Sequence, residues 1–231
     1  MGNIIEAEGL SKVYLRGKEK IHALGGIDLS IVKGEFVSVM GPSGSGKTTL
    51  LNLLSCLDTA TSGSLRIKKW DVSGLPENKL VKFRREYMGF VFQQFFLLPT
   101  LTVQENVGLP LLFRRKRTES SKIGSILKTV GLEDRADHLP SQLSGGEMQR
   151  VAIGRALINE PEIIFADEPT GNLDSTSGKA IFHLFRNLNQ KDITVVVVTH
   201  NQELAEIADR VIHLLDGKIS SVPEKNKPNI V

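Results

Sequence analysis

A glycine-rich segment near residue 40 constrains this chain more than any other feature. It follows an apolar stretch, residues 35–40, precedes a helix-like stretch, residues 48–57, and reads Gly41-Pro42-Ser43-Gly44-Ser45-Gly46-Lys47-Thr48. Glycines let a backbone curl so that successive N–H groups point at one anion, and the following helix adds its positive N-terminal end. The complete pattern in this context predicts a phosphate-binding loop, with Lys47 on the β- and γ-phosphates and the Thr48 hydroxyl on Mg²⁺.

Two other interpretations of these glycines compete with the phosphate loop. Gly44 and Gly46 are spaced as in a dinucleotide-binding fingerprint, but Thr49 stands where that fingerprint needs a third glycine. The segment could also be a glycine-rich turn that binds nothing. The full match between a buried strand and a helix argues against that interpretation.

A pair of carboxylates follows a second apolar run. Residues 163–166 are apolar and lead directly into Asp167 and Glu168. Beside a phosphate loop, Asp167 is suited to hold Mg²⁺, and Glu168 to orient and activate an attacking water. The same two carboxylates could form a solvated turn before Pro169. The phosphate loop favours the functional interpretation.

The order of apolar stretches predicts an α/β fold. Residues 163–166 and 194–199 are strand-like and are separated by a helix-like stretch, residues 177–188. Strand, helix and strand in succession indicate a parallel sheet with crossover helices. We therefore predict a P-loop NTPase core with a mostly parallel sheet, an antiparallel β subdomain formed by short N-terminal strands, and an inserted helical subdomain.

The predicted boundaries follow changes in composition. Residues 1–220 form one domain, and the helical subdomain occupies about residues 94–158, with Pro99, Pro110 and Pro140 interrupting its elements. Asp216-Gly217 predicts a tight hairpin turn near the end of this domain. Residues 221–231 are expected to be a polar C-terminal tail.

Composition excludes several classes of protein. The chain has 29 Lys and Arg against 26 Asp and Glu, so a net charge of +3 gives no indication of a nucleic-acid partner. A single cysteine, Cys56, rules out an internal disulfide framework and is expected to be a small buried apolar residue. The sequence shows neither a signal peptide nor a stretch of the roughly 18–20 apolar residues that a membrane-spanning helix needs. We therefore expect a chain in a reducing interior that does not cross a membrane by itself.

A second candidate anion site ends 17 residues before Asp167. The segment reads Leu143-Ser144-Gly145-Gly146-Glu147-Met148-Gln149-Arg150. It could be only a helix start with permissive glycines. Ser144 and the glycine amides, however, also form a cradle for an anion at a helix N-terminus. Because one chain needs only one phosphate loop for one ATP, the second cradle suggests a nucleotide held by another subunit.

The motifs together resemble the ATP-binding cassette (ABC) ATPases over nearly the whole chain. In order, they are Tyr14, the loop at 41–48, Gln93, the segment at 143–150, Asp167-Glu168, Gly171-Asn172-Leu173-Asp174 and His200. The resemblance implies ATP and Mg²⁺ as cofactors. It also implies a homodimer of two copies arranged head to tail, in which each ATP lies between the phosphate loop of one copy and the cradle of the other.

The resemblance assigns a role to each matching residue. It implies that Glu168, His200 and Gln93 are catalytic, with His200 at the γ-phosphate. It also implies that Thr48, Gln93 and Asp167 are the ligands of Mg²⁺. Tyr14 would stack on adenine, although a strand-edge tyrosine is the plain alternative, and Asp174 would lie at the subunit interface. The nucleotide-binding residues are then Tyr14, Gly41, Pro42, Ser43, Gly44, Ser45, Gly46, Lys47, Thr48, Thr49, Ser144, Gly145, Gly146 and Asp174.

Several short sequence segments are similar to those of the lipoprotein-release and macrolide-export type of cassette. This resemblance implies an ATPase at the cytoplasmic face of the cell membrane that powers integral membrane subunits. Chromosome and translation cassettes need a long coiled-coil insertion or two cassettes, which this chain lacks, and a substrate kinase leaves the Ser144 cradle unexplained. An ATP-dependent switch that controls a wall hydrolase or sensor without transport stays open as the alternative. Glu147 and Gly154 depart from the commoner Gln and Ala.

Two short segments are candidates for surface contacts. Residues 95–99 follow Gln93 where the family docks the coupling helix of its membrane partner, although they could instead fill the helical subdomain's own core. Residues 114–117 are all basic and could contact anionic lipid or form a solvated loop.

Overall fold

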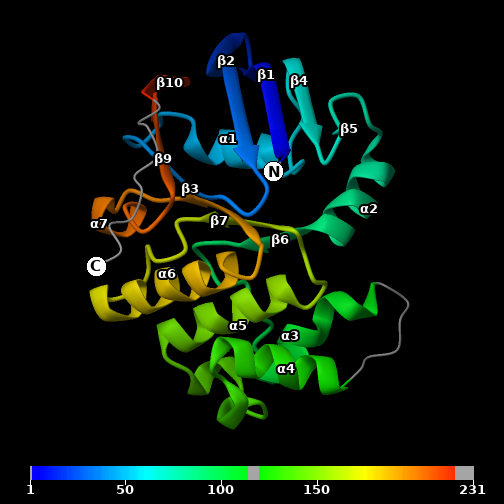
Figure 1. Ribbon diagram of the computed structural model, residues 1–231, viewed down its shortest axis with the longest axis vertical. Helices are drawn as coiled ribbons and strands as arrows, with labels where there is room; N and C mark the ends of the chain where they lie inside the picture. Colours follow the sequence, from blue (N-terminus) through cyan, green and yellow to red (C-terminus); the bar gives the residue numbers. More distant parts are fainter. Residues whose placement is uncertain (1, 114–119, 222–231) are drawn as a thin grey trace.

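The computed structural model describes residues 2–113 and 120–221 as two sheets and a group of helices (Figure 1). The first sheet is antiparallel, in the order β2-β1-β4-β5. Its strands are β1 (Asn3–Arg16), β2 (Glu19–Val32), β4 (Ser62–Ile67) and β5 (Trp70–Asp71). The predicted antiparallel β subdomain is therefore present, but its two N-terminal strands are long rather than short.

The second sheet carries the phosphate-loop candidate and has the order β10-β9-β3-β8-β7-β6. It is parallel except for β10, which pairs antiparallel with β9. Its strands are β3 (Phe36–Met40), β6 (Met88–Val91), β7 (Ile163–Asp167), β8 (Thr194–Val198), β9 (Arg210–Leu215) and β10 (Lys218–Ser221). Every residue of β8 is fully buried, as expected of a central parallel strand covered on both faces.

Helices cover this sheet and form a separate group at one end of the molecule (Figure 1). Those associated with the sheets are α1 (Lys47–Leu54), α2 (Glu77–Tyr87), α6 (Ser175–Asn189) and α7 (Gln202–Ala205). The separate group contains α3 (Val103–Leu112), α4 (Ser120–Val130), α5 (Gly145–Leu157) and two single 3₁₀ turns, Glu133–Arg135 and Pro140–Gln142. Helices thus occupy most of the range expected for the inserted subdomain.

Gly154 has a packing reason that the sequence does not reveal. A Cβ at this position of α5 would lie 3.2 Å from Val107 Cγ2 and 3.3 Å from Ile126 Cγ2, which belong to α3 and α4. Glycine therefore allows three helices to approach closely at this point. The expected loss of helix propensity relative to alanine, up to about 1 kcal/mol, is offset by this contact.

Several local expectations differ from the structure. α1 ends at Leu54 rather than residue 57 because Cys56 adopts a left-handed backbone with φ 57°. Pro110 lies inside α3 and does not interrupt it. β5 and α7 are only two and four residues long, too short to give a periodic pattern.

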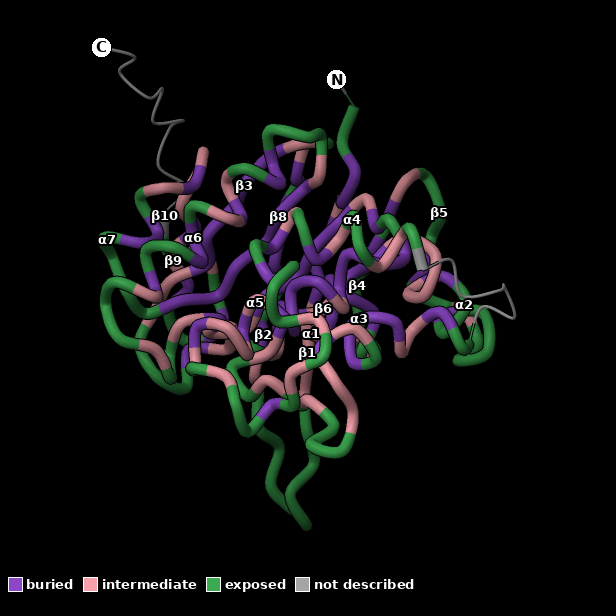
Figure 2. Tube along the Cα trace, turned by 90° about the horizontal axis from the view of Figure 1, so that it is seen from below, coloured by how far each residue is buried: buried purple, intermediate pink, exposed green. Residues whose placement is uncertain are grey.

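The buried residues lie mainly in the strands of the two sheets and in the helices packed against them (Figure 2). Cys56 is buried as expected, and this burial raises the pKa of its thiol to about 12. No helix among the described residues is both long and apolar enough to cross a bilayer. The basic residues 114–117 and nearly all of the expected tail lie outside the described residues.

Candidate nucleotide-binding site

The segment 41–48 forms a tight loop between β3 and α1, as its sequence predicts. A Cβ at Gly41 would lie 2.1 Å from the Leu214 carbonyl oxygen. Gly46 has φ 100°, and its Cβ would lie 2.6 Å from the Ala23 carbonyl oxygen. Neighbouring strands therefore press on the loop backbone, and no larger residue fits these two positions.

The loop borders an open pocket of about 570 Å³. It is lined by Ile21, His22, Ala23, Gly41, Pro42, Ser43, Gly44, Gly46, Lys47, Thr48, Thr49, Glu168 and His200. The phosphate-loop residues thus share one cavity with Glu168 and His200. These two residues lie at least 120 positions after Thr48 in the sequence. His22 also lines the pocket, although nothing in its sequence context pointed to this site.

Lys47 is suited to an anionic ligand, whereas the Ser45 hydroxyl is not exposed to the pocket. The Lys47 ammonium donates to the carbonyl oxygens of Gly41 and Pro42 at 2.8 and 2.9 Å, so its described partners are neutral acceptors and not carboxylates. Ser45 does not line the pocket. Its hydroxyl is buried and has no hydrogen-bond partner among the described residues, unlike the great majority of buried polar groups.

Thr48 and Asp167 meet at the edge of the pocket. The Thr48 hydroxyl lies 3.3 Å from Asp167 Oδ1, although the two residues are 119 positions apart. Burial raises the pKa of Asp167, and the neighbouring Glu168 adds to the rise while Thr48 and Lys47 oppose it. A hydroxyl and a carboxylate in contact are the hard oxygen donors that Mg²⁺ prefers. No cluster of three or more His, Cys, Asp or Glu suitable for a metal occurs among the described residues.

The raised pKa of Asp167 predicts a stability effect. Because the folded chain holds this proton more tightly than the unfolded chain, ionisation of Asp167 opposes folding. Its stabilising contribution is present at low pH and is lost as the pH rises through the raised pKa. We expect Asp167→Asn to raise the melting temperature at neutral pH without nucleotide or Mg²⁺, and to abolish Mg²⁺-dependent ATP hydrolysis. Melting curves across pH check this, since the difference should disappear in acid; a lower melting temperature for the variant at neutral pH contradicts it.

Glu168 and His200 form a direct pair inside the pocket. His200 Nδ1 lies 2.8 Å from Glu168 Oε2, and the His200 amide donates to the same oxygen at 3.3 Å. An ionised carboxylate only accepts hydrogen bonds, so the proton shared in this contact belongs to His200 Nδ1. Glu168 has φ 45°, and its amide donates to the Val198 carbonyl oxygen. A left-handed non-glycine residue is costly, and such strain is concentrated at functional sites.

Tyr14 lies beside this pocket rather than in its lining. It is paired with Ile21 across β1 and β2, and Ile21 does line the pocket. The Tyr14 hydroxyl donates to Asp58 Oδ2 at 2.8 Å, and the residue keeps 37% of its surface exposed. Tyr14 is thus the cross-strand neighbour of a pocket residue, and its hydroxyl is held by a carboxylate that the sequence did not single out.

The predicted sensor Gln93 has its described hydrogen bonds with Asn172 and none with Thr48 or Asp167. Its amide nitrogen lies 3.5 Å from Asn172 Oδ1, and the Asn172 amide donates to the Gln93 carbonyl oxygen at 3.1 Å. Gly171 makes room for this contact, because a Cβ there would lie 2.7 Å from Gln93 Nε2. The structure therefore joins Gln93 to the 171–174 segment, and Gln93 is not part of the pocket lining.

The Ser144 cradle stands at the N-terminus of α5 and does not line the pocket. Ser144 caps the helix by accepting from the Glu147 amide, and Glu147 Oε2 in return accepts from the Ser144 amide and hydroxyl at 2.8 Å each. These bonds lower the pKa of Glu147. The departure from Gln at position 147 thus places an ionised carboxylate against the predicted anion cradle.

Asp174 is occupied as the N-cap of α6. Its Oδ1 accepts from the amides of Thr176 and Ser177, and its Oδ2 accepts from the Ser177 hydroxyl. Gly146 lies against Ser177, where a Cβ would be 3.1 Å from the hydroxyl oxygen. Asp174 and Gly146 are therefore near neighbours through Ser177, and neither lines the nucleotide pocket of the same chain.

The comparisons with known proteins agree with this geometry. Residues 24–171 match the family described as ABC transporter. The uncharacterized ABC transporter ATP-binding protein MJ1508 of Methanocaldococcus jannaschii is 51% identical over 229 residues, which cover 96% of this chain and all of that protein. The macrolide export ATP-binding/permease protein MacB of Bdellovibrio bacteriovorus is 48% identical over 218 residues. Those residues cover 94% of this chain but only 34% of MacB, so this chain spans about a third of that relative's length.

A solved structure extends the likeness to the fold. The ATP-binding cassette MJ0796, in a dimeric post-hydrolysis state with ADP and Pi, superposes with a TM-score of 0.88 at 46% identity. The match covers 96% of this chain and 99% of that one. The chain belongs to the ABC transporter family, as an ATP-binding subunit that hydrolyses ATP.

Proposed function

We propose that this chain powers membrane subunits of the lipoprotein-release or macrolide/peptide-export type through ATP-driven dimerisation. One observation supports the proposal: the Ser144 cradle, at the N-terminus of α5, does not line the nucleotide pocket of its own chain. A second copy arranged head to tail would bring its own cradle to this pocket. The dimeric state of MJ0796 and the similarity to MacB support this assignment.

In this proposal the pocket residues divide the work on ATP. The loop at 41–49 binds the phosphates through its backbone amides and Lys47, while Tyr14 stacks on the adenine. Glu168 orients and activates the attacking water, and His200 contacts the γ-phosphate from the position fixed by its bond to Glu168. The second copy contributes Ser144, Gly145, Gly146 and Asp174.

Mg²⁺ completes the proposed site. Thr48 and Asp167 would hold it, since their oxygens already meet at 3.3 Å. Bound there, the ion would neutralise charge that develops on the phosphates. Gln93 is proposed to report on the ion or water after a movement, because its amide is bonded to Asn172 in this structure.

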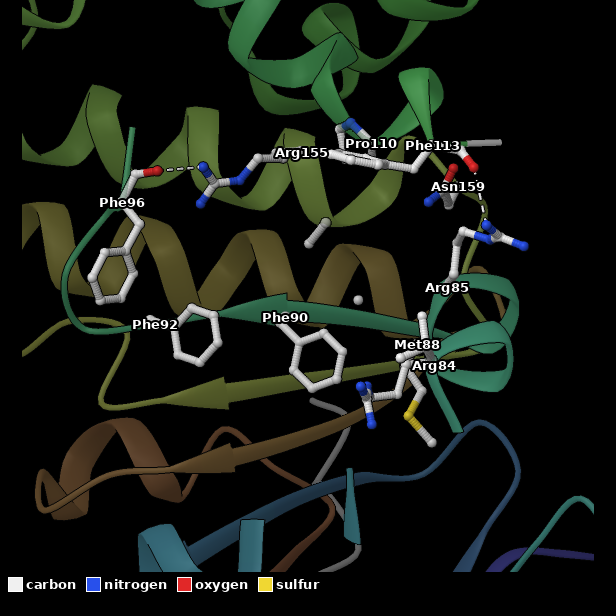
Figure 3. Close-up of a pocket in the computed structure, with 13 residues that line it drawn as sticks. Arg84, Arg85, Met88, Phe90, Phe92, Phe96, Pro110, Phe113, Arg155 and Asn159 are labelled. Carbon is white, nitrogen blue, oxygen red and sulfur yellow. Dashed lines mark hydrogen bonds between the residues drawn. The ribbon is translucent and has the colours of Figure 1, made fainter. Parts of the chain in front are cut away.

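A groove between the sheet and the helical subdomain supports docking of a membrane partner. It has a volume of about 640 Å³ and is lined by Phe90, Phe92 and Phe96 on one side and by Pro110 and Phe113 on the other (Figure 3). Within residues 95–99, Leu97 packs on the core, while Phe96 stays 58% exposed and lines the groove.

The polar groups of this groove indicate the chemistry of its occupant. Arg155 donates to the carbonyl oxygens of Phe95 and Phe96, and Arg85 donates to that of Phe113 (Figure 3). Neither arginine forms an ion pair with a described residue, and Arg85 Nε is buried without a partner there. We therefore propose that the partner supplies a short helix with an apolar face and at least one carboxylate. On this basis we place the chain at the cytoplasmic face of the membrane, held there by its partners.

Phe96→Glu tests the groove. The variant removes an apolar ring from the groove and adds a carboxylate that competes with the partner's carboxylate for Arg155, so partner-dependent transport or partner-stimulated ATPase should fall by about tenfold or more. Basal ATPase of the isolated chain should stay within about twofold, as Phe96 does not line the nucleotide pocket. Leu15→Glu is the matched control, since Leu15 is 73% exposed and lies outside the groove. Equal losses of basal and stimulated activity would indicate a folding defect instead.

The partner class is tested by co-purification. A tagged Glu168→Gln chain is expressed in its source organism, extracted in mild detergent with Mg-ATP, and its companions are identified by mass spectrometry. A membrane subunit with few spans and a large external domain is the expected result. A many-span permease would contradict the proposed subfamily, and a soluble partner alone would contradict transport.

A further inference from the structure

Three side chains beside the nucleotide pocket form one hydrogen-bonded group. The Tyr14 hydroxyl donates to Asp58 Oδ2 at 2.8 Å, and the Lys12 ammonium lies 2.7 Å from Asp58 Oδ1. Lys12 also donates to the Thr59 carbonyl oxygen, and its nitrogen lies 4.8 Å from the centroid of the Tyr14 ring. The tyrosine is thus held at its hydroxyl and on one face of its ring.

The group is placed so that it can act on a bound nucleotide. Tyr14 and Ile21 are directly opposite on β1 and β2, so their side chains project from the same face of the sheet. Ile21 and Thr49 line the pocket, and the Thr49 hydroxyl is close enough to affect the pKa of Tyr14. The exposed remainder of the ring therefore stands next to the cavity, while Lys12 covers part of it.

Asp58 stays charged in this setting. Burial favours its neutral form, but the bonds from Lys12, Tyr14 and the Thr59 amide together hold the pKa of Asp58 below its ordinary value. A charged acceptor makes a stronger hydrogen bond than a neutral one. Fixing the ring before a ligand arrives removes part of the entropy that stacking would otherwise lose.

We propose that Asp58, supported by Lys12, is a positioning residue that orients the Tyr14 ring for the adenine base. This inference rests on the proposed stacking role of Tyr14. Asp58 is not among the residues that line the pocket with the phosphate loop, so its effect is expected at the base alone. The sequence gives no sign of the arrangement, because Tyr14 and Asp58 are 44 positions apart and belong to no common motif.

The experiment compares binding of ADP and of inorganic pyrophosphate, which has no base, by calorimetry. Asp58→Ala and Tyr14→Phe should each weaken ADP binding by about threefold to tenfold. Each variant removes the hydrogen bond between the Tyr14 hydroxyl and the Asp58 carboxylate and leaves the other residue unchanged. The double variant should be no weaker than either single variant. Asp58→Asn, which keeps an acceptor for the tyrosine hydroxyl, should restore affinity to within about twofold. Pyrophosphate affinity should be unchanged throughout, and KM for ATP should rise while kcat is retained.

The outcomes separate this inference from the proposed function on which it rests. Tyr14→Ala should weaken ADP binding by roughly tenfold or more, as expected for loss of a stacked base. If Tyr14→Ala has that effect while Asp58→Ala and Tyr14→Phe have none, positioning by Asp58 is overturned and stacking stands. If Tyr14→Ala leaves ADP binding unchanged, stacking itself is overturned. A loss of pyrophosphate binding equal to that of ADP in Asp58→Ala would also overturn the inference, because it would show a defect of the phosphate loop.

Discussion

Replacing Glu168 by Gln is expected to slow ATP hydrolysis by about 10²- to 10⁴-fold while ATP binding is kept, because a positioned general base contributes on that order. Glutamine keeps the size of the side chain and an acceptor for His200, whose Nδ1 lies 2.8 Å from Glu168 Oε2. With hydrolysis blocked, the ATP-bound dimer should accumulate. Single-turnover hydrolysis and size-exclusion chromatography in Mg-ATP measure the two effects.

The matched control for this variant is Glu203→Gln. Glu203 is a carboxylate on α7 whose only described ion pair, with Lys179, is exposed to solvent. The Glu203→Gln chain should hydrolyse ATP at the rate of the unchanged chain and remain monomeric after turnover. A Glu168→Gln chain that hydrolyses ATP within tenfold of the unchanged chain would contradict the role of Glu168.

Replacing Glu35 by Ala is expected to lower the free energy of unfolding by about 3–5 kcal/mol, because it strands a buried cation. Arg210 Nε lies 2.8 Å from Glu35 Oε1, and Glu35 Oε2 accepts from Arg210 Nη2 and from the Val32 amide. Both side chains are nearly buried, with 14% and 7% exposure for Arg210 and Glu35. The pair ties the start of β3, the strand before the phosphate loop, to β9.

Urea unfolding followed by circular dichroism measures this loss. Glu203→Ala is the control, since its ion pair with Lys179 has side chains 59% and 78% exposed and should contribute less than about 1 kcal/mol. If the two alanine variants are equally stable, the buried pair does not stabilise the strand that precedes the nucleotide site. Loss of stability in Glu35→Ala should also weaken ATP binding only in proportion to the unfolded fraction.

The fold was predictable where the sequence pattern is local and strong. The loop between β3 and α1 is complete within eight residues, and its glycines are required by the backbone of Leu214 and Ala23. Helix starts were harder to place: α6 begins at Ser175 rather than residue 177 because Asp174 caps it. Pro110 was expected to break a helix, yet α3 continues past it to Leu112. Such features depend on side-chain bonds and packing rather than on periodicity.

The candidate site was predictable as a set of motifs but not as a set of contacts. The sequence named Glu168 and His200 separately, and only the structure shows their bond. It named Gln93 as a metal or water contact, whereas the structure bonds it to Asn172. His22 lines the pocket and Asp58 holds Tyr14, and neither stands in a recognisable pattern. Long-range contacts between single residues are set by the packing of the two sheets, which one sequence does not reveal.

The head-to-tail arrangement is tested most directly by mixing two defective chains, both carrying Glu168→Gln. One also carries Lys47→Ala and lacks a working phosphate loop; the other also carries Ser144→Arg and lacks a working cradle. The mixture should contain one complete composite site, formed by the loop of the second chain and the cradle of the first. Analytical ultracentrifugation in Mg-ATP should therefore detect a dimer in the mixture and monomers in each chain alone. Dimers in either chain alone, or monomers in the mixture, would contradict a nucleotide shared between two copies.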